Sequence, residues 1–154
     1  LNYRPAPGIR KYLAGTPPVL SMAAIEPALD IIFDAGIENI REKSIQQTNY
    51  LIELSRQLLF PYGFTLGSPI QAANRGSHIS IRHPEAYRIC RSMINPEKDE
   101  YSVIPDFREP DNIRLGIAPL YTSFQEIYQA VRIIENIMNN KSYERFSDER
   151  DSVT

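Results

Sequence analysis

The sequence has a single cysteine, Cys90, and therefore no internal disulfide. This usage fits a reducing compartment, and we expect a cytoplasmic protein. No apolar run approaches the roughly 18–20 residues that cross a bilayer, and the N-terminus lacks a charged-then-apolar leader. These features argue against a disulfide-stabilised secreted domain and a membrane protein. Because the first residue is Leu1 rather than Met, we also expect a piece of a longer polypeptide.

An excess of charge of one sign is also missing. The 154 residues include 17 basic and 19 acidic side chains, for a formal net charge of -2, and the two signs are well mixed. A nucleic-acid or anionic-membrane partner would be expected to leave a basic stripe. We therefore expect neither nucleic acid nor membrane as a partner.

The common catalytic and metal-binding motifs are missing as well. There is no glycine-rich phosphate loop and no G-x-S-x-G elbow. His78 and His83 lie five positions apart, so on one strand they point to opposite faces and no metal site is expected. We interpret Cys90, on the inward side of a short predicted helix, as a small buried hydrophobe rather than a nucleophile.

What is present begins with an N-terminal segment unlike the rest. Residues 1–17 are rich in proline and glycine and predict a loop. From Val19 to Phe33 nearly every side chain is apolar or small, which predicts a helix buried on most sides. Pro27 should kink or break this helix, and Gly36 is a typical C-cap. We interpret residues 1–36 as the end of a larger domain.

The remainder shows helical and strand periodicity in turn, which predicts an α+β domain over residues 37–138. Short gaps between its strands favour antiparallel pairing. A capping box at Ser123–Glu126 opens the last helix. Residues 139–154 are polar and charged, and we expect a flexible tail. The expected elements are a helix over 37–59, strands at 64–66 and 76–82, a helix over 84–94, strands at 101–107 and 112–118, and a helix from 124 to about 138.

One of these strands carries an unexpected arginine. Ile113, Leu115 and Ile117 form an apolar face, whereas Arg114 shares the other face with a glycine, Gly116, that leaves space beside it. On spacing alone, a half-exposed strand with Arg114 in water is the simpler interpretation.

Two further stretches have open interpretations. Gly15-Thr16 precedes the first helix, where backbone amides and a hydroxyl suit an anion, but an ordinary threonine N-cap is the alternative. Arg75-Gly76 precedes a strand and either holds a carboxylate or simply begins that strand.

Three segments together resemble the C-terminal part of kynureninase: G-I-R-K-Y-L-A-G-T-P-P-V-L-S (8–21), R-G-S-H-I-S-I-R-H (75–83) and V-I-P-D-F-R-E-P-D-N-I-R-L-G-I-A-P-L-Y-T-S-F (103–124). The resemblance implies the small domain of a pyridoxal-phosphate enzyme of the aspartate-aminotransferase fold (fold type I). It implies a homodimer that hydrolyses L-kynurenine, or its 3-hydroxy form, to anthranilate and L-alanine in tryptophan catabolism and NAD biosynthesis.

The resemblance also implies roles for individual residues. Arg114 pairs with the α-carboxylate of the substrate, Thr16 reaches the cofactor phosphate of the neighbouring subunit, and Gly15 borders the aromatic ring of the substrate. The Schiff-base lysine and the other residues that hold the cofactor ring fall upstream of residue 1. The lysines of this chain match none of these positions, so it contains no catalytic residue and we expect it to be inactive alone. They are Lys11, Lys43, Lys98 and Lys141.

Two alternatives remain at this point. In the first, the chain is part of another fold type I enzyme, either a class V aminotransferase or a cysteine desulfurase. In the second, the chain is a non-catalytic interaction domain that docks through its apolar first helix. The position of Cys90 on the core side of a helix weighs against a desulfurase.

Overall fold

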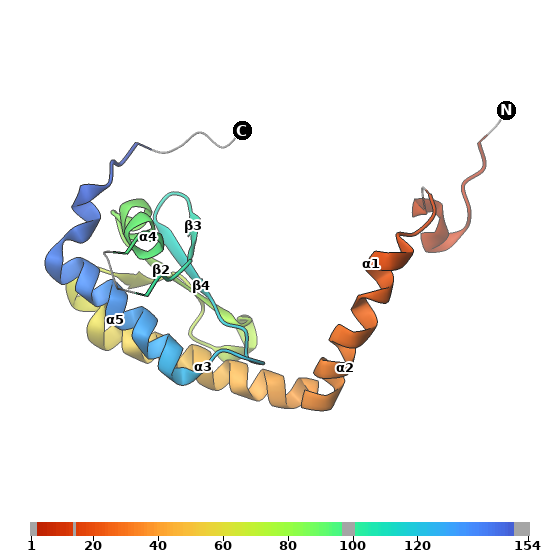
Figure 1. The fold of residues 1–154 in the computed structure, drawn as a ribbon, viewed down its shortest axis with the longest axis horizontal. Helices are drawn as coiled ribbons and strands as arrows, with labels where there is room; N and C mark the ends of the chain where they lie inside the picture. Colours follow the sequence, from red (N-terminus) through yellow and green to blue (C-terminus); the bar gives the residue numbers. More distant parts are fainter. Residues whose placement is uncertain (1–2, 14, 97–100, 150–154) are drawn as a thin grey trace. The chain divides into compact units, whose positions relative to one another are not determined.

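The computed structural model describes residues 3–13, 15–96 and 101–149, and Figure 1 shows their fold. The chain divides into two compact units, Leu1–Ile37 and Glu38–Thr154, which are described separately below. Within the described ranges, no helix combines the length and apolar character of a membrane span.

The N-terminal unit contains a 3-10 turn, η1 (Gly8–Tyr12), and two helices, α1 (Val19–Ala23) and α2 (Ile25–Ala35). The predicted break is confirmed, because α1 ends four residues before Pro27. The proline ring would clash with the carbonyl group of that residue in a continuous helix. Gly36 ends α2 at φ 78°, and its N–H donates to Ile32 O at 2.9 Å, so the predicted glycine C-cap is also confirmed.

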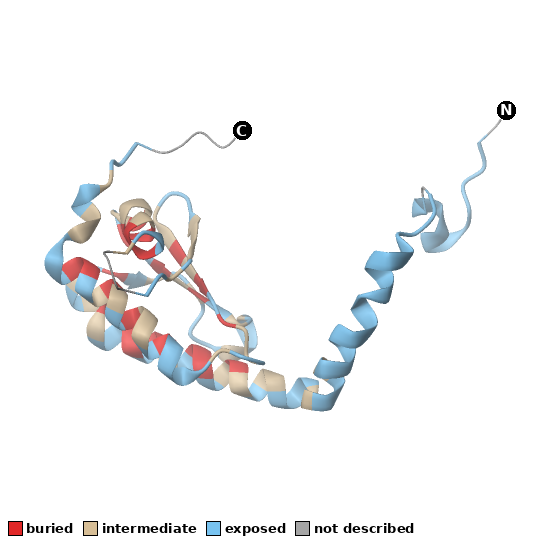
Figure 2. Cartoon of the chain, in the orientation of Figure 1, coloured by how far each residue is buried: buried red, intermediate tan, exposed pale blue. Residues whose placement is uncertain are grey.

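Apolar side chains of α1 and α2 remain exposed. Figure 2 shows both helices almost entirely pale blue, and Leu20 and Phe33 are 88% and 73% exposed. Neither helix contains a buried residue. Burial of this segment against further polypeptide therefore stays a prediction.

The second unit is built on a four-stranded sheet in the order β1-β2-β4-β3, with every neighbouring pair antiparallel. The helix α4 (Ala86–Ile94) connects β2 to β3, and β4 returns between them. This arrangement confirms the predicted α+β class and antiparallel pairing. The strands are β1 (Thr65–Leu66), β2 (His78–Arg82), β3 (Asp106–Arg108) and β4 (Asn112–Gly116).

One face of this sheet forms the core. Ile79 and Ile81 of β2 lie opposite Leu115 and Ile113 of β4, and all four are buried. The α4 helix packs with α3 (Ile37–Leu58) and α5 (Phe124–Asn140) around these side chains in one apolar cluster. Large members of that cluster from the three helices are Leu51, Ile52, Ile89, Met93, Val131, Ile134 and Ile137. Because strand side chains alternate, burying this face leaves the other face polar.

The predicted capping box opens α5. Ser123 Oγ accepts a hydrogen bond from the Glu126 N–H at 3.1 Å, and Glu126 Oε2 accepts one from the Ser123 N–H at 2.7 Å. The bond from the Ser123 N–H, and then the bond that the Ser123 hydroxyl donates to Glu126 Oε2 at 2.8 Å, lower the pKa of Glu126. The prediction is therefore confirmed in both of its halves.

Strand β3 is shorter than the predicted strand over 101–107. Pro105 has no N–H to donate to a ladder. Just before it, the Val103 N–H donates to Met93 O and Ser102 Oγ to Ile94 O, each at 3.0 Å. These bonds tie the segment to the end of α4 instead of to the sheet.

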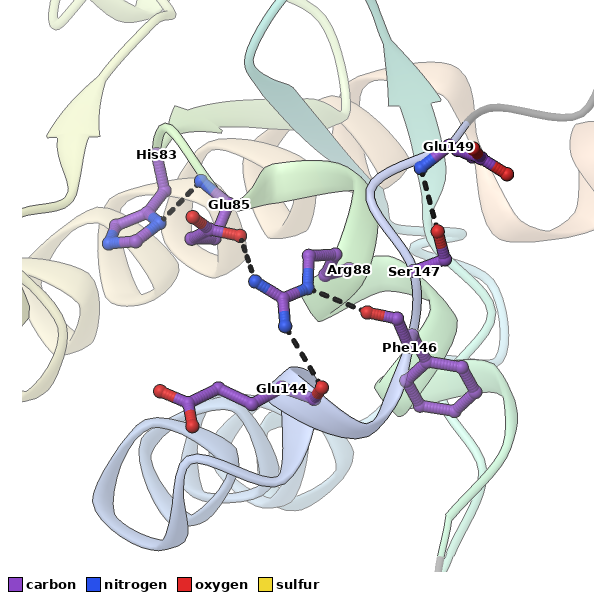
Figure 3. A network of polar contacts seen from close by, with 7 residues as sticks. All are labelled: His83, Glu85, Arg88, Glu144, Phe146, Ser147 and Glu149. Carbon is purple, nitrogen blue, oxygen red and sulfur yellow. Dashed lines mark hydrogen bonds and ion pairs between the residues drawn. The ribbon is translucent and has the colours of Figure 1, made fainter.

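The C-terminal residues also differ from the expected tail. Helix α5 continues to Asn140, and the 3-10 turn η4 (Ser142–Arg145) follows. Arg88 of α4 donates to the carbonyl groups of Glu144 at 2.9 Å and Phe146 at 2.8 Å, and to the Glu85 carboxylate at 2.9 Å. Figure 3 draws these contacts. Arg88 thus ties a segment without apolar periodicity to α4, and Tyr143 of the same segment packs against the core. Residues 150–154 of the expected tail lie outside the described residues.

Candidate functional site

Arg114 lies near the middle of β4, on the polar face of the sheet. It is directly opposite Ser80 of β2 on one side and Asp106 of β3 on the other. Its neighbours in sequence, Ile113 and Leu115, are buried, as the alternation predicts. The Arg114 side chain is 40% exposed, so it is neither in the core nor fully in water.

The guanidinium group of Arg114 has an acidic partner that sequence reasoning missed. Arg114 Nη2 forms an ion pair with Asp106 Oδ2, and Arg108 Nε donates to the same oxygen at 2.9 Å. The cluster therefore has two guanidinium groups and one carboxylate. It keeps one positive charge in excess, which suits an anionic ligand.

The strand register was the one feature of the sequence from which the pairing of Asp106 with Arg114 could have been predicted. Once the turn after Arg108 is fixed, alternate residues of β3 fall opposite Arg114 and Asn112. Predicting this pair required the turn length as well as the two strand periods, because a slip of one residue would move Asp106 to the other face.

Space and donors remain beside Arg114. A Cβ atom added at Gly116 would meet nothing within 4 Å. Among the described residues, the Nε and Nη1 atoms of Arg114 have no hydrogen-bond partner. A guanidinium presents five N–H groups in a plane and binds carboxylates in a two-pronged manner. Asp106 contacts Nη2, which has two N–H groups, so the second Nη2–H together with Nε–H or Nη1–H still forms one edge that can meet a carboxylate.

Arg82, on the same face of the sheet, has other partners than Arg114. Arg82 Nε donates to Asn112 Oδ1 at 3.2 Å and lies 3.9 Å from Asp111 Oδ1. Ser80 Oγ also donates to Asn112 Oδ1, at 2.9 Å. Asn112 and Asp111 thus hold Arg82 at the far end of β4 from Gly116.

Helix α3 fixes the loop that follows β4. Lys43 Nζ donates to Pro119 O at 2.5 Å, and Gln47 Nε2 donates to Thr122 O at 2.6 Å. Gln47 is fully buried. These bonds hold the chain on the Gly116 side of Arg114 at a defined place.

Gly15 and Thr16 belong to the Leu1–Ile37 unit, whereas Arg114 belongs to the other unit, so each is described within its own. Both are exposed. The N-cap residue of α1 is Pro18, without a side-chain cap bond, so the interpretation of Thr16 as an ordinary N-cap is wrong. Within the described residues the Thr16 hydroxyl has no hydrogen-bond partner, and Gly15 has open space where a Cβ would lie.

A role of Gly15 and Thr16 at the phosphate end of a pyridoxal phosphate group stays a prediction. A free threonine hydroxyl beside a glycine suits a phosphate oxygen. The expectation that no lysine of this chain attaches the cofactor also stays a prediction, and the surroundings of three of these lysines are described. Lys43 is engaged with Pro119, Lys11 lies over the Tyr12 ring at 5.0 Å, and Lys141 is the C-cap residue of α5. Lys98 lies outside the described residues.

The structure separates the two interpretations of Arg75. Its guanidinium donates to Ile70 O and Asn49 Oδ1, and to Thr48 Oγ1 at 3.2 Å. Burial and the nearby charge of Arg41 lower its pKa. Arg75 therefore holds its own loop against α3, with all three of its guanidinium nitrogens bonded to residues of this chain.

The two histidines point apart, as their spacing predicts. His78 is exposed on the polar face, whereas His83 is buried against the Phe64 ring, with ring centroids 4.6 Å apart. His83 Nδ1 accepts from the Glu85 N–H at 3.0 Å, a bond drawn in Figure 3, and His83 Nε2 lies 3.2 Å from Tyr62 O. No cluster of three potential metal ligands occurs in residues 3–13, 15–96 and 101–149.

Cys90 is 3% exposed, which confirms the interpretation as a core residue. Burial, with a smaller contribution from the charge of Asp106, raises the pKa of the Cys90 thiol to about 12. A thiol in this state is a poor nucleophile at neutral pH.

Comparison with known proteins gives consistent matches. The family described as the kynureninase C-terminal domain matches residues 40–134. The kynureninase of Geobacillus thermodenitrificans is 47% identical over 142 residues, which cover 92% of this chain and 32% of that relative. The kynureninases of a Bacillus cereus strain and of Pseudomonas fluorescens are 42% and 39% identical, and the match again covers 92% of this chain and 32% and 33% of the relatives. The chain thus spans about a third of the length of the curated relatives it matches.

The buried His83 gives a testable pH dependence. Burial lowers the pKa of His83 in the folded state, although its bond to Tyr62 and the charge of Glu85 act in the opposite direction. Below about pH 6.5 the unfolded state therefore binds a proton that the folded state rejects. We expect the free energy of unfolding to fall as pH drops from about 6.5 toward the lowered pKa.

Urea unfolding of the chain at about pH 7.5 and about pH 5.5 measures this dependence. His83→Gln, which keeps one acceptor and one donor, should lose less stability between the two values than the unsubstituted chain. His78→Gln, at an exposed position, serves as the matched control. An equal loss in the His83→Gln variant and the unsubstituted chain would contradict the assignment.

Proposed function

The chain belongs to the kynureninase family, and from this premise we propose that it supplies the carboxylate-binding part of an enzyme that hydrolyses L-kynurenine, or its 3-hydroxy form, to anthranilate and L-alanine. The observation that carries the proposal is the setting of Arg114. Its guanidinium lies half-buried on a polar sheet face, is held by Asp106 at one nitrogen, and has open space beside Gly116.

Arg114 would bind the α-carboxylate of the substrate. The planar N–H groups that Asp106 leaves free match the two oxygens of a carboxylate. Such a two-pronged bond fixes the orientation of the amino acid as well as its position, so that its reacting bonds are held in one geometry. The single positive charge left over in the Arg108–Asp106–Arg114 cluster balances the single negative charge of the acid.

The proposed cofactor is pyridoxal 5'-phosphate, which supplies an electron sink for carbon–carbon bond chemistry when it is bound. In a homodimer, Thr16 would donate its hydroxyl hydrogen to a phosphate oxygen, and Gly15 would leave room for the aromatic ring of the substrate. The described residues supply binding and orientation, and we assign them no proton transfer.

A desulfurase reaction has no support in this chain. That chemistry needs an accessible thiol nucleophile, whereas Cys90 is buried and its pKa is raised to about 12. The matched family favours hydrolysis over this alternative, whereas a carboxylate site at Arg114 would serve any amino-acid substrate.

Substitution of Arg114 tests the proposal in the longer protein that contains this chain. Losing one partner of a charge pair in a binding site costs about 2–5 kcal/mol, and we take the lower value because Arg114 is half-exposed. Arg114→Ala should therefore raise KM for kynurenine about 30-fold, with the visible absorbance of the bound cofactor unchanged. The KM of Arg114→Lys should lie between the values of the unsubstituted enzyme and Arg114→Ala, because an ammonium group keeps the charge but cannot form the planar pair.

The matched control is Arg82→Ala, because Arg82 lies on the same sheet face but is held by Asn112 and Asp111. Its KM should stay within about twofold of the unsubstituted enzyme. An unchanged KM in Arg114→Ala would remove Arg114 from the site.

A second prediction concerns the covalent end of the cofactor site. Lys11, Lys43, Lys98 and Lys141 provide no expected attachment point. After incubation of the 154-residue chain with pyridoxal phosphate and borohydride reduction, peptide mass spectrometry should show no more labelling of any lysine than in the unfolded chain. The chain alone should also fail to turn over kynurenine. Stoichiometric labelling of one lysine that disappears on unfolding would contradict this expectation.

A further inference from the structure

The carboxylate of Asp106 is shared between two arginines on the polar face of the sheet. Its Oδ2 atom accepts from Arg108 Nε at 2.9 Å and forms the ion pair with Arg114 Nη2. Arg108 is two residues along the same strand, and Arg114 is directly opposite across the β3–β4 ladder. Arg108 restrains the Asp106 carboxylate from its own strand. The restrained carboxylate can then orient the Arg114 guanidinium through their ion pair.

No other described side chain fulfils this role for Arg114. On the β2 side, Ser80 faces Arg114, but its hydroxyl donates to Asn112. On the next position of the same face, Gly116 has no side chain. A long arginine side chain with one neighbour of opposite charge depends on that neighbour for its orientation.

The geometry of the ion pair also shows whether Asp106 orients Arg114 or competes with a ligand for its N–H groups. Asp106 contacts one guanidinium nitrogen, Nη2, through one of its oxygens. A competing internal carboxylate would be expected to engage two nitrogens and so cover the edge that a ligand needs. Nη2 has two N–H groups and meets one Asp106 oxygen, so its second N–H and a neighbouring Nε–H or Nη1–H, which have no partner among the described residues, leave one edge for an added carboxylate while Asp106 keeps its place.

We propose that Asp106 is a positioning residue that orients Arg114 toward the carboxylate of the substrate. This inference rests on the proposed function, because it assumes that Arg114 binds that carboxylate. It predicts that removing the Asp106 charge impairs recognition of the acid group while the chemical steps are retained.

The test uses Asp106→Asn in the longer protein, a substitution that keeps size and shape. We expect KM for kynurenine to rise about tenfold, less than the roughly hundredfold that a misplacement of about 1 Å costs at a reacting centre, and kcat to stay within about twofold. Asp106→Glu keeps the charge and should recover part of the loss. Asp111→Asn is the matched control, since Asp111 pairs with Arg82 on the same sheet, and its KM should not change.

Inhibition measurements separate positioning from general structural support. A competitive inhibitor that carries the α-carboxylate should lose affinity in Asp106→Asn, whereas its analogue without that carboxylate should bind both proteins equally. In an Arg114→Ala background, Asp106→Asn should have no further effect on KM.

Several results would overturn the inference. They are an unchanged or lowered KM in Asp106→Asn, equal weakening of both inhibitors, or an undiminished effect in the Arg114→Ala background. If Arg114→Ala raises KM and Asp106→Asn does not, the inference fails and the proposed function stands. If the unsubstituted protein does not turn over kynurenine, or Arg114→Ala leaves KM unchanged, both fail.

Discussion

The alternation of side chains along β4 is the constraint on which the rest of the site depends. Ile113 and Leu115 are buried in the core, and this burial fixes the register of β4 with both of its neighbours. A slip of one residue would expose these side chains and bury Arg114. The same apolar burial that stabilises the domain therefore sets Arg114 on the polar face, opposite Asp106. The position of the Arg114 guanidinium therefore follows from core packing and needs no separate local interaction to set the register.

The surrounding elements make this sheet a rigid support. Helix α3 fixes the loop after β4 through Lys43 and Gln47, and Arg88 of α4 holds the C-terminal segment through main-chain carbonyl groups. Binding groups carried on packed strands keep their geometry better than groups carried on loops. The charge pattern follows the same division, with neutral side chains in the core and an excess positive charge at the Arg108–Asp106–Arg114 cluster.

Local signals in the sequence predicted much of the fold. Period-two and helical patterns placed the main strands and helices, the Ser123–Glu126 pattern gave the capping box, and Pro27 marked the helix break. The failures share a cause. The short β3 and the contacts of Arg88 depend on polar bonds to other elements, and the Asp106–Arg114 pair depends on the turn length between β3 and β4. Neither kind of feature leaves a periodic pattern in the sequence. Spacing alone placed Arg114 in water, and only the resemblance to a family suggested its role. The roles of Gly15 and Thr16 remain proposals, because they involve a cofactor and a neighbouring subunit.

The most direct measurement is a crystal structure of the longer protein with cofactor and a competitive inhibitor that carries the α-carboxylate of the substrate. The account predicts that both carboxylate oxygens lie within hydrogen-bond distance of the Arg114 guanidinium while Asp106 Oδ2 still contacts Nη2. A carboxylate held by other residues, with Arg114 directed into solvent away from it, would contradict the account.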